Sequence, residues 1–127
     1  MLGHISFGVA DLARTKNFYD AVMAALGYAC VYADDRCIGY GYQGTDQDKL
    51  LFRQVPGPVV LPAIGFHLCF DAADHAAVDR FHGAGVASGG TDNGQPGLRP
   101  EYGPDYYAAF LVDPNGYQIE AKAVKPA

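Results

Sequence analysis

The sequence has no long apolar run, few basic residues and too few cysteines for a disulfide framework. No stretch approaches the roughly 18 consecutive apolar residues that a membrane-spanning helix needs. The opening residues also lack the basic and apolar regions of a secretion signal. With 9 Lys and Arg against 14 Asp and Glu, the formal net charge is −5, which argues against binding to nucleic-acid phosphates. We therefore expect neither a membrane nor a nucleic-acid partner.

The three cysteines are an odd number without metal-type spacing, which is typical of a reducing compartment. Cys30 and Cys37 could face each other across a hairpin, but we expect both to remain reduced, and the protein to be cytoplasmic. Half of the 127 residues are hydrophobic (50%), enough for one domain with a sizeable core.

An internal repeat organises the chain. Five identities fall in one register: His4 with His67, Phe7 with Phe70, Asp11 with Asp74, Phe18 with Phe81, and Gly27 with Gly90. Each half begins as an alternating strand, passes an aspartate that can cap a helix, and leaves the helix at glycine. The repeat predicts module one at 1–56, a proline-rich linker at 57–63 and module two at 64–127.

Hydrophobic periodicity gives the expected elements of each module. Module one is expected to contain a helix at 12–26 and strands at 2–9, 28–32, 37–42 and 49–54. Module two is expected to contain a helix at 74–86, strands at 64–70, 106–112 and 117–121, and a long Gly/Pro loop at 89–107. Neither module can bury its sheet alone, so two must cover each other, in one chain or across a dimer. The predicted class is α+β with two βαβββ modules.

Strand alternation places three metal-ligand candidates on equivalent faces. His4, His67 and Glu120 each lie on the strand face opposite the apolar residues that suit a helix. Two imidazoles and a carboxylate suit Zn, Fe(II), Mn, Ni or Co, and three ligands leave positions open for a substrate that chelates through neighbouring oxygens. A single strand histidine is more often an ordinary polar residue, and a glutamate near a chain end is usually solvated. The agreement between repeat and alternation is what indicates a metal site.

Several segments resemble the glyoxalase, bleomycin-resistance and extradiol-dioxygenase superfamily, known as vicinal oxygen chelate proteins. In module one these are residues 3–12 (GHISFGVADL), 17–19 (NFY) and 26–28 (LGY). In module two they are residues 65–67 (GFH), 81–82 (FH) and 113–120 (DPNGYQIE). The resemblance covers nearly the whole chain and is most diagnostic at the Asp-Pro-Asn-Gly turn that leads to Glu120. It implies a cup-shaped mixed sheet and, commonly, a homodimer.

One position departs from the glyoxalase I pattern. Those enzymes carry a fourth ligand on the last strand of module one, where alignment with Glu120 places Phe52 or a close neighbour. Phenylalanine can neither bind a metal nor accept a proton, which argues against glyoxalase I activity and leaves Phe52 as a substrate contact. The remaining two histidines and one glutamate resemble the ligands of fosfomycin-resistance thiol transferases and ring-cleaving dioxygenases.

The leading hypothesis is a metal-dependent enzyme acting on a small oxygen-rich substrate, by lyase or isomerase chemistry, thiol transfer or dioxygenation. Glu120 would be both a ligand and a catalytic proton carrier. Arg99 would bind an anionic group of the substrate, and Tyr102 or Tyr107 would hydrogen-bond to the substrate or stack on it. The alternative for this segment is a packed surface loop with a solvated arginine.

Other polar residues receive simpler interpretations. His75 and His82 are expected on the exposed side of their helix, and Cys69 as a small filler beside His67. The second functional hypothesis is a metal-free protein of the bleomycin-resistance type, which sequesters a cationic drug in an acidic dimer groove. A scaffold role is a third option, for which the sequence offers no positive feature.

Overall fold

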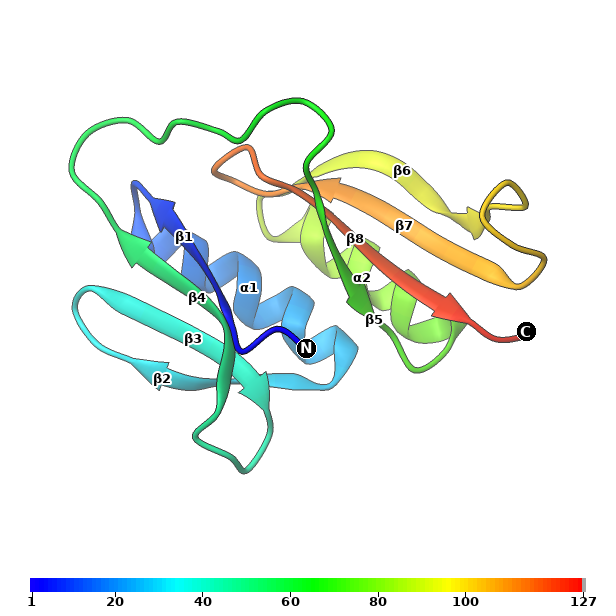
Figure 1. Ribbon diagram of the computed structural model, residues 1–127, viewed down its shortest axis with the longest axis horizontal. Coiled ribbons are helices and arrows are strands. Elements are labelled where there is room, and N and C mark those ends of the chain that lie inside the picture. Colours follow the sequence, from blue (N-terminus) through cyan, green and yellow to red (C-terminus); the bar gives the residue numbers. More distant parts are fainter. Residues whose placement is uncertain (127) are drawn as a thin grey trace.

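The computed structural model describes residues 1–126 and shows two βαβββ modules joined by a long linker (Figure 1). The elements of module one are β1 (Ile5–Val9), α1 (Leu12–Leu26), β2 (Tyr28–Ala33), β3 (Cys37–Tyr42) and β4 (Asp48–Gln54). Those of module two are β5 (Leu68–Asp71), α2 (His75–Ala87), β6 (Thr91–Leu98), β7 (Tyr106–Val112) and β8 (Gln118–Val124). The predicted α+β class is confirmed.

Each module forms its own four-stranded mixed sheet, with the order β1-β4-β3-β2 in the first and β5-β8-β7-β6 in the second. The first strand of each module runs parallel to the last, and the other pairs are antiparallel. β1 and β5 are therefore edge strands. Within residues 1–126, no helix is long and apolar enough to cross a bilayer.

The two helices lie side by side and join the modules (Figure 1). Phe18 and Val22 of α1 and Phe81 of α2 are fully buried at this junction, where they exclude water from both sheets. Gly85 permits the close approach, because a Cβ there would lie 2.3 Å from Leu111 Cδ1. Helix packing thus covers one face of each sheet and leaves the other face free of helices.

The predicted caps are present at both helix starts. The Asp11 carboxylate accepts a hydrogen bond from the Arg14 amide at 3.0 Å, and that of Asp74 from the Ala77 amide at 2.8 Å. Gly27 ends α1 with φ at +87°, a conformation that favours glycine. These local signals set where each helix begins and where the first one ends.

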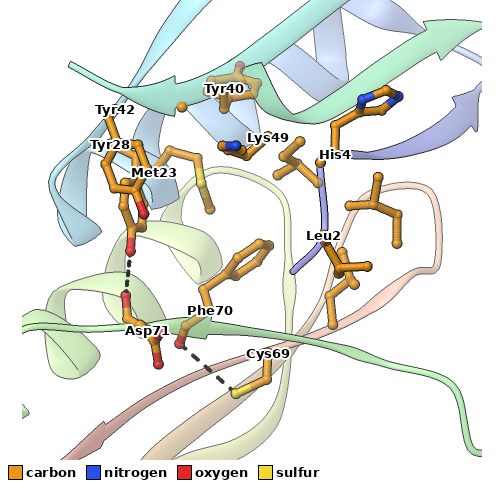
Figure 2. Close-up of a pocket in the computed structure, with 15 residues that line it drawn as sticks. Leu2, His4, Met23, Tyr28, Tyr40, Tyr42, Lys49, Cys69, Phe70 and Asp71 are labelled. Atoms are coloured by element: carbon orange, nitrogen blue, oxygen red, sulfur yellow. Dashed lines mark hydrogen bonds between the residues drawn. The ribbon is translucent and has the colours of Figure 1, made fainter. Parts of the chain in front are cut away.

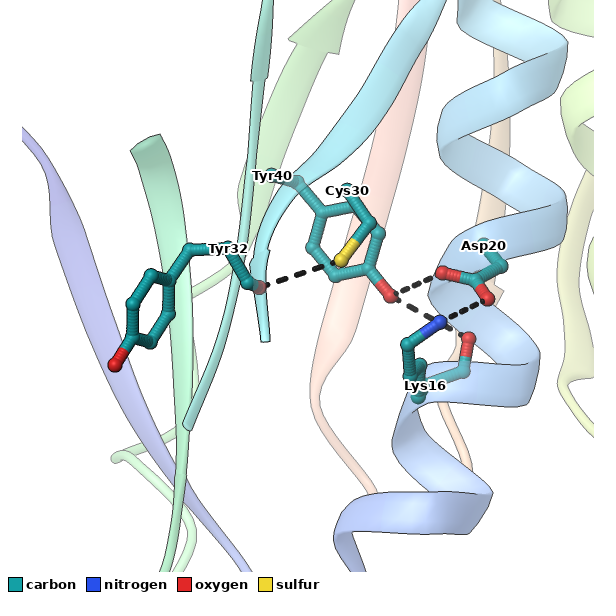
Figure 3. A network of polar contacts seen from close by, with 5 residues as sticks. All are labelled: Lys16, Asp20, Cys30, Tyr32 and Tyr40. Carbon is teal, nitrogen blue, oxygen red and sulfur yellow. Dashed lines mark hydrogen bonds and ion pairs between the residues drawn. The ribbon is translucent and has the colours of Figure 1, made fainter. Parts of the chain in front are cut away.

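A polar network fixes α1 against β3 (Figure 3). The buried Tyr40 hydroxyl donates to Asp20 Oδ1 at 2.8 Å, and Lys16 Nζ lies 2.7 Å from Asp20 Oδ2. Burial and this hydrogen bond raise the pKa of Tyr40, so the phenol remains a donor. Cys30 donates a weak hydrogen bond to the carbonyl of Tyr32, and all three cysteines are free.

The expected loop at 89–107 is wrong in its first half, where Thr91–Leu98 forms the edge strand β6. Its pairing with β7 is irregular between Asp92 and Gly94 and between Gly94 and Gly97. Glycine and proline are tolerated at an edge and at bulges, which is why the segment resembles a loop in sequence. β5 also begins later than expected, at Leu68, so that His67 lies just before it.

Candidate metal and substrate site

His67 and Glu120 meet on the helix-free face of the second sheet. β5 and β8 pair in parallel with Cys69 opposite Glu120, and this register brings His67 Nε2 to 2.8 Å from Glu120 Oε1. The Glu120 side chain is 4% exposed and that of His67 is 42% exposed. A carboxylate buried to this extent needs polar partners, and the imidazole provides one that solvent can still reach.

Tyr106 holds the second carboxylate oxygen. Its hydroxyl donates to Glu120 Oε2 at 2.6 Å. Loss of solvent and the hydrogen bond to Glu120 both raise the pKa of Tyr106, so the phenol stays protonated. Glu120 is therefore oriented from both sides, with Tyr106 on one oxygen and His67 on the other.

Tyr107, which the sequence suggested as a substrate contact, lies on the opposite face of β7. Its hydroxyl donates to Asp79 of α2 at 2.6 Å, and its ring stacks on His75 at 3.9 Å. Phe110 pairs directly with Glu120, so even-numbered residues of β7 share the Glu120 face and odd-numbered ones face α2. Tyr106, and not Tyr107, therefore lies on the face of the sheet that carries Glu120.

Cys69 lies beside Glu120 on the same face. Partial burial, followed by the charge of the Glu120 carboxylate, raises the pKa of Cys69 to about 12. A thiol that stays protonated is a poor nucleophile, which agrees with its interpretation as a small filler.

Arg99 and Tyr102 lie around the same face. The Arg99 guanidinium sits 5.4 Å above the Phe110 ring, and that ring lies 6.2 Å from the imidazole of His67. Tyr102 is 63% exposed and packs edge-on against Tyr106 at 5.3 Å. Both residues therefore lie near the sheet face that carries His67 and Glu120.

His4 does not join His67 and Glu120 within one chain. It is exposed just before β1 and lines a pocket of about 240 Å³ between the first sheet and β5. In Figure 2 its ring is turned away from Cys69, which lines the same pocket. Within residues 1–126, no three His, Cys, Asp or Glu side chains converge on a point that could hold a metal ion. One chain brings together two of the three ligand candidates.

Phe52 is a core residue, so its expected contact with substrate is wrong. Its side chain is fully buried on the helix side of the first sheet, with its ring 4.2 Å from that of Tyr19. Ser6 pairs with Leu51 in β4, just as Cys69 pairs with Glu120 in β8. Leu51 is therefore the counterpart of Glu120, and it too can bind no metal.

His82 is buried, contrary to the expectation that it lies exposed. Its Nε2 lies 2.8 Å from Asp92 Oδ1 at the start of β6. Hydrogen bonds from the Gly94 amide and from His82 lower the pKa of Asp92. The carboxylate therefore stays charged, which strengthens its hydrogen bond with His82. The sequence predicts a loop at residues 89–107, and a loop gives no reason to expect this contact between α2 and β6.

Comparisons with known proteins found no matching family model and no matching curated protein. Solved structures do match. A glyoxalase/bleomycin resistance protein from Albidiferax ferrireducens T118 is 32% identical, with a TM-score of 0.81 over 94% of this chain and 96% of that one.

Two further structures share the fold at lower identity. A glyoxalase/bleomycin resistance protein/dioxygenase family enzyme from Burkholderia phytofirmans PsJN is 20% identical, with a TM-score of 0.72 over 98% of both chains. A fosfomycin resistance protein from Mesorhizobium loti is 21% identical, with a TM-score of 0.70 over 98% of this chain and 92% of that one. The chain belongs to the glyoxalase/bleomycin resistance protein family, within the vicinal oxygen chelate superfamily that its motifs predict.

Proposed function

We propose that this chain is a subunit of a homodimeric, metal-dependent enzyme that acts on a small oxygen-rich molecule. His67 and Glu120 of one subunit would bind the ion together with His4 of the partner subunit. The observation that carries the proposal is the contact of His67 Nε2 with Glu120 Oε1 at 2.8 Å, on a sheet face that no helix covers. Lyase or isomerase chemistry, thiol transfer and dioxygenation are the candidate reactions.

The donor set fits a divalent ion. An imidazole nitrogen and a carboxylate oxygen in contact are donors that Zn, Fe(II), Mn, Ni and Co accept, and Tyr106 fixes the other carboxylate oxygen. A bound ion would act as a Lewis acid on neighbouring oxygens of the substrate. Glu120 would hold the ion through Oε1, while the hydrogen bond from Tyr106 to Oε2 keeps the carboxylate from rotating.

A second copy of the chain would provide the third metal ligand, His4. β1 and β5 are free edges, and His4 and His67 each lie next to one of them. Leu2, Ile64 and Phe66, close in sequence to the two histidines, are exposed at 70%, 107% and 41%. A symmetric dimer would cover these apolar side chains while bringing His4 to the other subunit's site.

Metal content tests the proposal directly. Protein purified without chelators is expected to contain about one divalent ion per site, lost in His67→Ala and Glu120→Ala but kept in His75→Ala. Tyr106→Phe leaves both ligands in place and is expected to weaken metal binding roughly 10- to 100-fold. Protein without bound metal, whose melting temperature does not rise with Zn, Ni, Mn, Co or Fe(II), would overturn it.

A metal-free binding protein of the bleomycin-resistance type is the second candidate. The net charge of −5 favours a cationic ligand, whereas the cation of Arg99 on the site face disfavours one. A His4→Ala/Glu120→Ala double variant that binds its ligand as tightly as the wild-type protein would support this candidate over the enzyme.

A further inference from the structure

Arg99 is held in a defined position at the end of β6. Its Nη1 donates to the Gly97 carbonyl at 2.9 Å and its Nη2 to the Gln95 carbonyl at 2.7 Å. The guanidinium thereby folds back along its own strand and lies over Phe110. An arginine fixed by two hydrogen bonds and an aromatic ring loses little further conformational entropy when it binds a ligand.

Two glycines provide the space for this arrangement. A Cβ at Gly97 would lie 3.2 Å from Arg99 Nη1. A Cβ at Gly94 would lie 2.9 Å from Phe110 Cδ2 and 3.4 Å from Arg99 Nη2. Any side chain at these positions would press on the guanidinium or on the ring beneath it. The glycines of β6 therefore serve the placement of Arg99 as well as the irregular backbone.

The charge of Arg99 has no acidic partner among the residues that the structure describes. Among residues 1–126, no carboxylate lies within 4.0 Å of its guanidinium, although the chain carries 14 acidic residues. Its hydrogen-bond acceptors are neutral carbonyls, which leave the positive charge uncompensated and other N–H groups free for a ligand. Phe110 excludes water from one side of the guanidinium, which strengthens attraction to an anion.

Phe110 connects Arg99 to the proposed metal ligands. It pairs with Glu120 across β7 and β8, and its ring lies 6.2 Å from the His67 ring and 5.4 Å from the Arg99 guanidinium carbon. A ligand in contact with this ring can reach both groups. A guanidinium offers paired N–H donors that match a carboxylate, phosphonate or phosphate.

We infer that Arg99 is the anion-binding group of this site. The substrate then has an apolar segment beside Phe110, an anionic oxygen group on Arg99 and chelating oxygens toward His67 and Glu120. This inference deepens the proposed function and rests on it for the location of the substrate.

Small aromatic probes test the inference without the substrate. Benzoate and phenylphosphonate carry the anion on a flat ring, and benzyl alcohol is a neutral counterpart. Binding to the full-length protein can be measured by ligand-observed NMR, with and without added Zn. We expect both anions to bind more tightly than benzyl alcohol, and their ratio to show whether a carboxylate or a phosphorus oxyanion fits better.

Variants assign the effect to Arg99. Arg99→Gln is expected to weaken binding of the anions about 10-fold or more and to leave benzyl alcohol unchanged. Gly97→Ala keeps the arginine but displaces its guanidinium, so a smaller loss is expected. Arg80→Gln removes the same charge from the exposed side of α2 and should change nothing. Melting temperatures verify that each variant is folded.

The outcomes separate this inference from the proposed function. If Arg99→Gln binds the anions like the wild-type protein, or if neither anion binds at millimolar concentration, the inference fails whatever the metal content. If anion binding depends on Arg99 but the protein takes up no divalent metal, the inference stands and the proposed function fails.

Discussion

At the scale of single residues, Asp113 is the buried carboxylate that connects the two modules. It is 4% exposed at the turn between β7 and β8, where it accepts hydrogen bonds from the backbone amides of Asn115 and Tyr117, both at 2.9 Å. The Tyr19 hydroxyl of α1 donates to its Oδ2 at 2.7 Å. Burial raises the pKa of Asp113, while these hydrogen bonds act against the rise.

Tyr19→Phe should destabilise the fold. The substitution leaves the Asp113 carboxylate with one donor fewer in a site that water does not reach, which is expected to cost about 1–3 kcal/mol in the free energy of unfolding. Urea denaturation measures this loss. Tyr42→Phe, at a residue that is 58% exposed, is the matched control and should be nearly neutral.

The same variant should show a particular pH dependence. Because the pKa of folded Asp113 is raised, this group favours folding most below its unfolded value of 3.8, and the contribution is lost as pH rises through the folded pKa. Without the Tyr19 hydroxyl that pKa rises further. The loss in Tyr19→Phe should therefore be larger at pH 7 than near pH 4, and equal losses at both would contradict this account.

The sequence could not predict the whole site, because adjacent residues of a strand point to opposite faces of the sheet and the sequence does not show which face is which. Alternation within each strand correctly placed His67 and Glu120 on one face, but it could not fix the phase of β7 or β4. That phase depends on pairing across strands, where a shift of one residue exchanges the two faces. Hence the sequence predicts a contact at Tyr107, whereas Tyr106 lies on the Glu120 face, and it locates the counterpart of Glu120 only to Phe52 or a close neighbour, which the strand register identifies as Leu51.

At the scale of elements, α2 contains two glycines with different surroundings. Gly85→Ala would place a methyl group 2.3 Å from Leu111 Cδ1 and 3.2 Å from Val22 Cγ1, so the buried Leu111 side chain or α2 itself must shift. We expect a loss of about 1–3 kcal/mol in the free energy of unfolding.

Gly83, two residues earlier in α2, has open space where a methyl group would lie, with no atom within 4 Å of that point. Gly83→Ala is expected to stabilise the protein by about 0.5–1 kcal/mol, because alanine loses less backbone entropy in a helix. Urea denaturation of the pair measures both effects. A Gly85→Ala protein as stable as Gly83→Ala would show that the helix junction is looser than the structure indicates.

Most elements could be predicted because they carry local signals. Capping aspartates, the exit glycine and the Asp-Pro-Asn-Gly turn correctly placed both helices and the β7–β8 hairpin. β6 carries no such signal, since its Gly94, Pro96 and Gly97 are typical of loops. It is stabilised by pairing with β7 and by the contact of His82 with Asp92, both of which require the tertiary fold.

At the scale of the whole molecule, the repeat predicts two similar modules but not how they meet. Identities at fixed spacing show that His4 and His67 occupy equivalent places, each just before the first strand of its module. The two modules meet through the side-by-side packing of α1 and α2, and no strand of the first sheet pairs with a strand of the second among the described residues. Under the proposed function, a second chain would supply the histidine that one chain does not bring to His67 and Glu120.

Mixing two variants that each lack one proposed ligand tests whether two subunits share the ligands of a site. His4→Ala and Glu120→Ala homodimers each lack a ligand in every site, and neither is expected to bind metal tightly. In a mixed dimer one site receives both defects and the other none, because His4 and Glu120 of a shared site come from different subunits. After unfolding and joint refolding, random pairing should restore about one quarter of the wild-type metal sites. If each site used ligands from one chain only, no mixed dimer would contain an intact site, and metal binding would stay at the level of the separate variants.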